Sequence, residues 1–417
     1  MKADAFAAAV LAKCRILVCA GCGGVGKTTV AAALALEAAR RGRQVLVLTI
    51  DPARRLADAL GVGALGNQPQ PLPRAALTAQ GVPDEGGLSA LMLDMKRTFD
   101  DLVERFAESD EARERILRNP IYQHASDALA GSVEYSAMEK VFELHERGEF
   151  DLIVVDTPPA QHALDFLEAP QRLLEFLDSR IVQVLIHPAF AAGRFGFRLF
   201  HRSTRRVLQL VERVSGIGFL EDLSEFLLAF EGMAEGFRQR ARKVRGLLMG
   251  PEASFALVVG PDRESVAQAV DFLDRLEGFG VPLRAVLVNR MRLWTEEGAA
   301  ADWADAEADE ARVATLARAL AADAGPDFPA EDAARAALTA LTGYAALVER
   351  DARETRSLRG RIEGQGRYWG QIPEFADEIH DLGGLTRIAD SLFGRGPEAP
   401  AVDCAPTSAA ERRSRGV

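Results

Sequence analysis

The stretch that decides the fold reads Gly21, Cys22, Gly23, Gly24, Val25, Gly26, Lys27 and Thr28. It matches the pattern G-x-x-x-x-G-K-[ST] at every specified position, between an apolar run (residues 15–20, RILVCA) and an alanine- and leucine-rich stretch (residues 27–41). In a turn between a strand and a helix, glycines let consecutive N–H groups converge on phosphate oxygens, and the helix N-terminus adds partial positive charge. We therefore predict a phosphate-binding loop in which Lys27 reaches the β- and γ-phosphates and the Thr28 hydroxyl holds Mg²⁺.

The alternation of strand and helix patterns continues along the chain. Short apolar runs recur at residues 44–50 (QVLVLTI), 152–155, 255–259 and 285–288, with helical periodicity between them, for example at residues 265–276. Such runs are typical of parallel strands that are buried on both faces. The sequence predicts an α/β fold, a P-loop NTPase with a doubly wound, mostly parallel sheet.

Two stretches, about residues 88–148 and 164–250, show amphipathic helical periodicity without strands. We interpret them as helical insertions that pack together as an α-helical subdomain on one side of the sheet. Residues 395–417 show no apolar periodicity, which predicts a disordered tail. The rest of the chain, residues 1–394, is expected to be a single P-loop domain.

Composition narrows the class of protein. Of the 417 residues, 48% are hydrophobic and 27% charged, and the net charge is −11. An acidic chain lacks the basic surface that general nucleic-acid binding requires, so no nucleic-acid partner is expected. Four cysteines cannot build a disulfide framework in a chain of this size, which favours a reducing compartment. No apolar run reaches the length of a membrane span, so we expect a cytoplasmic protein without a stable membrane anchor.

Two aspartates follow predicted strands. Asp156 ends the strand at residues 152–155 and is followed by Thr-Pro-Pro, a position from which an acid binds Mg²⁺, often through water. Asp51 ends the strand at residues 44–50. Its spacing fits two roles equally well, orientation of an attacking water or capping of the next helix. We assign the metal to Thr28, Asp51 and Asp156, and catalysis to Lys27 and Asp51.

Five segments together carry a family resemblance: GCGGVGKTT, TIDPARRLADALG, VVDTPPAQHALDFL, VLVNR and PEFADEIHDLGGL. In order and spacing they resemble those of the ArsA/Get family of ATPases, relatives of the MinD/ParA group, and the resemblance covers roughly residues 15–393. It implies ATP and Mg²⁺ at the interface of a homodimer, with Asp51 activating water. It also implies an adenine-reading Asn289 and a base-covering loop around Pro373. The residues expected to contact the nucleotide are Gly21, Cys22, Gly23, Gly24, Val25, Gly26, Lys27, Thr28, Thr29, Asn289 and Pro373.

The chain departs from the family pattern in its phosphate loop. Cys22 stands where the family usually has a second lysine that reaches the partner's phosphates. The arsenite pumps of the family consist of two fused halves and carry metalloid-binding cysteines. This chain corresponds to one such half and lacks that set of cysteines. With these departures, the resemblance implies a dimeric Mg-ATPase that couples ATP hydrolysis to a conformational change on a protein client or partner. The alternatives are a ParA/MinD-like positioning or assembly switch, and an ATP-binding scaffold that scarcely hydrolyses.

Overall fold

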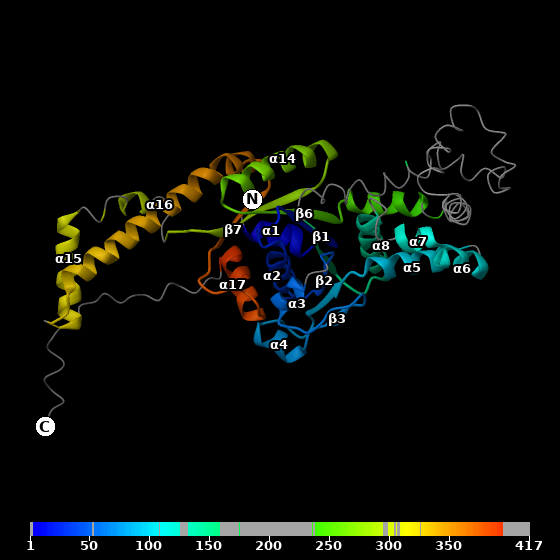
Figure 1. Ribbon diagram of the computed structural model, residues 1–417, viewed down its shortest axis with the longest axis horizontal. Coiled ribbons are helices and arrows are strands. Elements are labelled where there is room, and N and C mark those ends of the chain that lie inside the picture. The colour runs from blue at the N-terminus through cyan, green and yellow to red at the C-terminus, as the bar shows by residue number, and fades with distance from the viewer. Residues whose placement is uncertain are drawn as a thin grey trace, which may run out of the picture.

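The computed structural model of the protein describes residues 3–51, 54–107, 109–125, 132–158, 175, 236, 238–294, 299–303, 306, 309–325 and 327–394. In this part of the chain, eight strands form one sheet in the order β3-β4-β2-β5-β1-β6-β7-β8 (Figure 1). The strands are β1 Ile16–Gly21, β2 Gln44–Thr49, β3 Gln70–Pro71, β4 Gly87–Met92, β5 Leu152–Asp156, β6 Ala253–Val259, β7 Leu283–Met291 and β8 Tyr368–Pro373. All neighbours pair in parallel except β3 and β4. The predicted α/β class with a mostly parallel sheet is confirmed.

The central strands are buried on both faces, which explains why their sequences are continuous apolar runs. Every residue of β1, β5 and β6 is buried. The register pairs Cys19 and Thr49 with Asp156 from either side. Because the strands are parallel, the loop after β1 and the carboxyl ends of β2 and β5 meet at one edge of the sheet.

Helices cover both faces of this sheet. The connection from β1 through α2 (Lys27–Arg40) to β2 runs toward one edge, and that from β6 through α14 (Arg263–Phe279) to β7 runs toward the other. Right-handed crossovers therefore put α2 and α14 on opposite faces, as Figure 1 shows. Helix α17 (Leu382–Phe393) packs against α2, where Arg40 and Asp390 form an ion pair at 2.7 Å.

The remaining helices lie around the sheet, and α5 to α7 and α15 extend away from it on opposite sides (Figure 1). They are α1 Ala3–Phe6, α3 Arg55–Leu60, α4 Arg74–Ala79, α5 Met95–Phe106, α6 Asp110–Arg118, α7 Pro120–Ala125, α8 Ser132–Arg147, α15 Glu310–Ala324 and α16 Ala330–Ile362, with short helices at Ala7–Leu11 and Ala299–Trp303. Helices α15 and α16 form a hairpin with its own small core around Val313, Ala334 and Leu338. The 33 residues of α16 run from the outlying hairpin back to the sheet.

Three of the eight described strands were not predicted from the sequence: β4, β8 and the two-residue β3. The stretch from residue 88 was predicted to be helical without strands, but its first residues belong to β4, which pairs with β2. Strand β8 was not predicted either. The other described residues of the first insertion are mainly helical, and residues 238–248 of the second insertion are helical. Most of the second insertion and the predicted tail lie outside the described residues, and the single-domain boundary stays a prediction.

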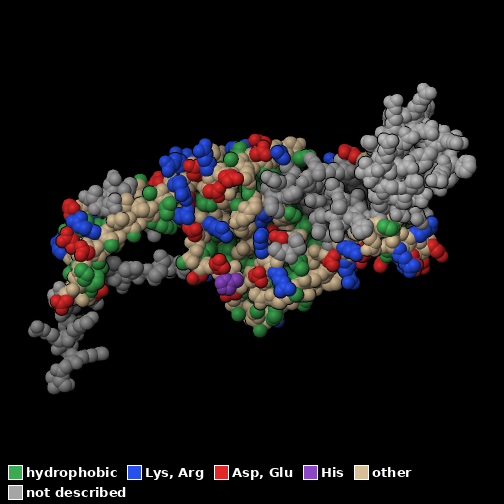
Figure 2. All heavy atoms as spheres, in the orientation of Figure 1, with side chains coloured by type: hydrophobic (Ala, Val, Ile, Leu, Met, Phe, Trp, Pro, Cys, Tyr) green, Lys and Arg blue, Asp and Glu red, His purple; other side chains and the backbone are tan. Residues whose placement is uncertain are grey.

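Charged side chains of both signs are interspersed over the face shown in Figure 2. None of the helices in the described part of the chain combines the length and the apolar character that crossing a bilayer requires.

Candidate functional site

The phosphate loop leaves β1 at a point where only glycine fits. A Cβ on Gly21 would lie 2.1 Å from the carbonyl oxygen of Val258 on the neighbouring strand. Gly26 has a φ of +87°, and a Cβ there would lie 2.4 Å from Nδ2 of Asn289. Gly26 is also the N-cap of α2 and supplies no capping side chain. No side chain caps the first turn of α2, so its backbone N–H groups can donate to a bound anion such as a phosphate.

Lys27 lies across this loop. Its ammonium donates to the carbonyl oxygen of Cys22 at 2.8 Å, and the residue is only 8% exposed. Burial lowers the pKa of Lys27 from its ordinary value, while the neighbouring carboxylate of Asp156 acts in the opposite direction. A partly desolvated ammonium beside the N-terminus of a helix is suited to binding a phosphate.

Asp156 is the most deeply buried acid at this edge, at 1% exposure. Its Oδ2 accepts hydrogen bonds from the hydroxyls of Thr28 at 2.7 Å and Thr49 at 2.9 Å. Its Oδ1 is buried and has no hydrogen-bond partner in the described part of the chain. Burial raises the pKa of Asp156 to about 6, although the hydrogen bonds from Thr28 and Thr49 oppose this rise.

This arrangement fits a magnesium ion. Mg²⁺ is bound in proteins by one or two carboxylates together with waters and substrate phosphates, rather than by a full protein cage. The orphaned Oδ1 of Asp156 and the adjacent Thr28 hydroxyl supply that kind of partial set. Accordingly, the described residues contain no group of three or more His, Cys, Asp or Glu side chains that could hold a metal ion unaided.

Asp51 lies at the end of β2 beside the same site. Its backbone N–H donates to the Thr49 hydroxyl at 3.2 Å, and its Oδ2 lies 3.3 Å from Nη1 of Arg55. The N-cap of α3 is Arg54, three residues after Asp51, and both roles predicted for Asp51 stay predictions. Asp51 is one of the charges that act on both Lys27 and Asp156.

A second group of predicted residues surrounds a cavity of about 380 Å³ next to α2. The cavity is lined by Gly26, Thr29, Asn289, Arg290, Pro373, Glu374, Phe375, Ala376, Asp377, Glu378, Ile379 and Ile388. It thus joins the phosphate loop to the ends of β7 and β8, and its volume is typical of a small-molecule site. Asn289 is buried, and its Nδ2 donates to the carbonyl oxygen of Val25 at 2.8 Å. Arg290 has a φ of 59°, a strained value for a non-glycine residue.

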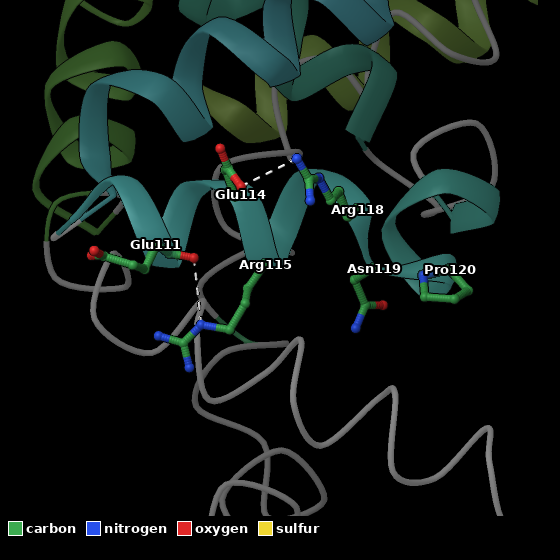
Figure 3. A pocket seen from close by; sticks show the side chains of 6 residues that line it. All are labelled: Glu111, Glu114, Arg115, Arg118, Asn119 and Pro120. Carbon is green, nitrogen blue, oxygen red and sulfur yellow. Dashed lines mark hydrogen bonds and ion pairs between the residues drawn. The ribbon is translucent and has the colours of Figure 1, made fainter.

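A cavity of about 420 Å³ beside α6 differs in character (Figure 3). It is lined by Glu111, Glu114, Arg115, Arg118, Asn119 and Pro120. Arg118 pairs with Glu114 within the helix, and Arg115 donates to the carbonyl oxygen of Glu111. None of the predicted site residues lines this cavity, so the candidate site is the one at the phosphate loop.

Comparison with known proteins agrees with the geometry. The sequence model of the family described as "Anion-transporting ATPase" matches residues 14–307. The chain belongs to the anion-transporting ATPase family. It is 26% identical to the ATPase GET3 of Malassezia globosa over 276 residues, which cover 66% of this chain and 72% of the relative. It is 23% identical to the putative arsenical pump-driving ATPase 2 of Aquifex aeolicus over 278 residues, which cover 66% of this chain and 80% of the relative.

A more local similarity reaches 32% identity, to the putative arsenical pump-driving ATPase of Halobacterium salinarum. It extends over 167 residues, 39% of this chain and 25% of the relative. The resemblance found in the sequence segments is therefore confirmed at the level of the family, and the chain is an ATPase of that family.

The departure from the family pattern at Cys22 is also visible in the structure. The Cys22 side chain is 4% exposed, and its Sγ lies 3.8 Å from the carbonyl oxygen of Ser265 in the first turn of α14. Burial raises the pKa of the thiol above its usual value, and the nearby Lys27 opposes this. Cys22 therefore presents a neutral, inward-facing side chain.

Sequence reasoning missed Thr49 as a site residue. Its hydroxyl accepts from the N–H of Asp51 and donates to the carboxylate of Asp156, so it joins the two acids. The sequence places Thr49 two residues before Asp51, but its contact with Asp156 follows from the pairing of β2 with β5.

Proposed function

We propose that this member of the anion-transporting ATPase family binds Mg-ATP in the phosphate-loop site and hydrolyses it there. The observation that carries the proposal is the carboxylate of Asp156. One of its oxygens is held by Thr28 and Thr49, and the other is buried and unpaired within the described residues. Burying a carboxylate oxygen without a partner raises the free energy of the folded state unless a cation binds to it.

Each residue has a defined part in this proposal. The loop N–H groups and Lys27 bind the phosphates, and Thr28 and Asp156 hold Mg²⁺. A bound Mg²⁺ would neutralise the negative charge that develops on the phosphate oxygens during hydrolysis. Asp51, tethered through Thr49, orients the attacking water. Asp51 is the candidate general base because its charge acts on both Lys27 and Asp156.

The cavity bounded by Asn289 and Pro373 receives the base. Since Nδ2 of Asn289 donates to the Val25 carbonyl, its Oδ1 is the atom left to meet a ligand. An acceptor in that position pairs with the amino group of adenine and opposes the carbonyl oxygen that guanine carries at the same place. The amide orientation therefore favours ATP over GTP.

Assembly and partner are part of the proposal. We propose a homodimer in the cytoplasm that couples hydrolysis to conformational change on a protein client. Support comes from the resemblance to the ArsA/Get family and from relatives that are named ATPase GET3. A weakly hydrolysing scaffold is the second candidate, because Cys22 is neutral and buried where the family usually has a cation. A slow basal turnover that no client stimulates would favour this candidate.

The isosteric variant Asp156→Asn tests the magnesium assignment. We expect calorimetry to show that Mg²⁺ strengthens ATP binding by the wild type and that this gain falls by about 10–100-fold in the variant, the range seen when metal-site ligands and their partners are altered. Affinity measured with a chelator in place of Mg²⁺ should be similar for both proteins. Equal Mg²⁺ dependence in the two proteins would reject the assignment.

A further inference from the structure

Arg292 bridges two acids that lie far from it in the sequence. It directly follows β7, and its Nη1 lies 3.2 Å from Oδ2 of Asp351 in the middle of α16. Its Nε lies 3.0 Å from Oε2 of Glu374, the first residue after β8. One guanidinium thus ties the long hairpin helix to the segment that lines the base cavity.

The Asp351 end of this bridge is firmly fixed. The Asp351 side chain is fully buried, and its Oδ2 also accepts from the backbone N–H of Arg292 at 3.3 Å, while Arg350 pairs with its Oδ1 at 3.1 Å. A buried carboxylate is tolerated only when charged and hydrogen-bonding partners compensate it. Removing Arg292 would take away one of these partners, so the position of α16 and that of Arg292 are interdependent.

Glu374 begins the segment, residues 374–379, that forms one wall of the base cavity. The N–H of Glu374 donates to the carbonyl oxygen of Met291 at 2.9 Å, and the next residue, Phe375, lies under the guanidinium of Arg387 at 4.6 Å. The wall segment therefore has two anchors, Arg292 at its start and Arg387 from α17. The carboxylate of Glu374 is 44% exposed, so its contact with Arg292 is the more easily broken of the two that Arg292 makes.

Two of the three members of this bridge lie beyond residue 307, where the match to the family model ends. We propose that Arg292 is a positioning residue that holds the base-covering wall in place and links it to α16, so that the α15–α16 hairpin helps to set the affinity for the adenine base. The inference rests on the proposed function, in which the base occupies this cavity. Arg292 touches no reacting atom in this account, and its effect is confined to the base end of the site.

The test compares two ligands that differ by the nucleoside. Affinities for Mg-ATP and for inorganic Mg-triphosphate are measured by calorimetry on the full chain for wild type, Arg292→Ala and Asp351→Asn. We expect both variants to lose about tenfold or more in ATP affinity, on the scale of one charge-assisted contact, and to keep the wild-type affinity for triphosphate. The matched control is Arg335→Ala, because Arg335 pairs with Glu310 and Glu331 within the same hairpin and does not line the cavity. It should behave as wild type with both ligands.

The outcomes separate this inference from the proposed function. Wild type that binds ATP no better than triphosphate would show that the base site itself is wrong. Wild type that prefers ATP, together with an unchanged preference in Arg292→Ala, would overturn the role of Arg292, and an unchanged preference in Asp351→Asn alone would overturn the link to the hairpin. Equal losses for both ligands would show a general structural effect and also overturn it. If thermal unfolding shows that Arg292→Ala does not fold, Glu374→Gln tests the same contact at a partly exposed position. This variant should likewise weaken the binding of ATP and leave the binding of triphosphate unchanged.

Discussion

The substitution Thr49→Val tests whether the two acids of the site act through their shared threonine. Thr49 is 1% exposed, and valine has nearly the same shape, so packing is retained while the hydroxyl is lost. The hydrogen bond to Asp156 at 2.9 Å then disappears, and the N–H of Asp51 loses its acceptor at 3.2 Å. A hydrogen bond to a charged acceptor contributes about 1.5–3 kcal/mol, which corresponds to roughly 10–150-fold in an equilibrium constant.

We expect this loss to appear in the magnesium requirement of the reaction. In a titration of steady-state ATP hydrolysis with Mg²⁺, Thr49→Val should need about tenfold or more Mg²⁺ for half-maximal rate, as expected when a group that orients a metal ligand is removed. Thr49→Ser, which keeps the hydroxyl, is the matched control and should follow the wild-type curve. A wild-type Mg²⁺ curve for the valine variant would refute the idea that Thr49 positions Asp156.

Three further predictions concern Asp51, Cys22 and Glu139. Asp51→Asn should keep ATP affinity within a few-fold by calorimetry while turnover falls by at least about tenfold, since general-base groups contribute at least this much; intact turnover would remove Asp51 from the chemistry. Cys22→Ala should leave ATP affinity unchanged within about threefold, because the loop offers the phosphates its N–H groups rather than this buried side chain; a large loss would show that the thiol itself matters. Burial raises the pKa of Glu139 in α8 from its ordinary value of 4.5 to about 7, although the ion pair with Arg240 at 2.6 Å opposes this rise. Between these values the folded protein keeps a proton that the unfolded chain loses, so the contribution of Glu139 to stability falls as pH rises. In denaturant unfolding, Glu139→Gln should show a weaker fall in stability than wild type over that pH window, and parallel pH curves would contradict the shift.

The sequence was most informative where the structural cause is local. The phosphate loop could be predicted because its glycines, Lys27 and Thr28 all lie within one turn and its flanking residues. The buried central strands could be predicted for a similar reason, since each is a continuous apolar run. Strand β4 was missed because Ser89 interrupts its apolar residues and a helical pattern follows it closely. Strand β8 was missed because Gly370 and Pro373 interrupt its short run.

Contacts between distant segments could not be read from the sequence. The role of Thr49 depends on the register that sets β2 beside β5, and nothing in the local pattern fixes that register. The bridge made by Arg292 joins residues that are 59 and 82 positions away. The inward position of Cys22 depends on α14, which follows more than two hundred residues later. Each of these features is a product of tertiary packing.

Phosphate release by the purified full chain tests directly whether the phosphate loop is the site of Mg-dependent ATP hydrolysis. The assay compares wild type, Lys27→Ala and Lys96→Ala, where Lys96 is an exposed lysine on α5 and serves as the matched control. We expect Mg²⁺-dependent release of phosphate from ATP by wild type and Lys96→Ala. Release by Lys27→Ala should be near background, because this variant loses a charge-assisted phosphate contact of about 1.5–3 kcal/mol. Equal release by Lys27→Ala and wild type, or release that does not depend on Mg²⁺, would contradict this assignment.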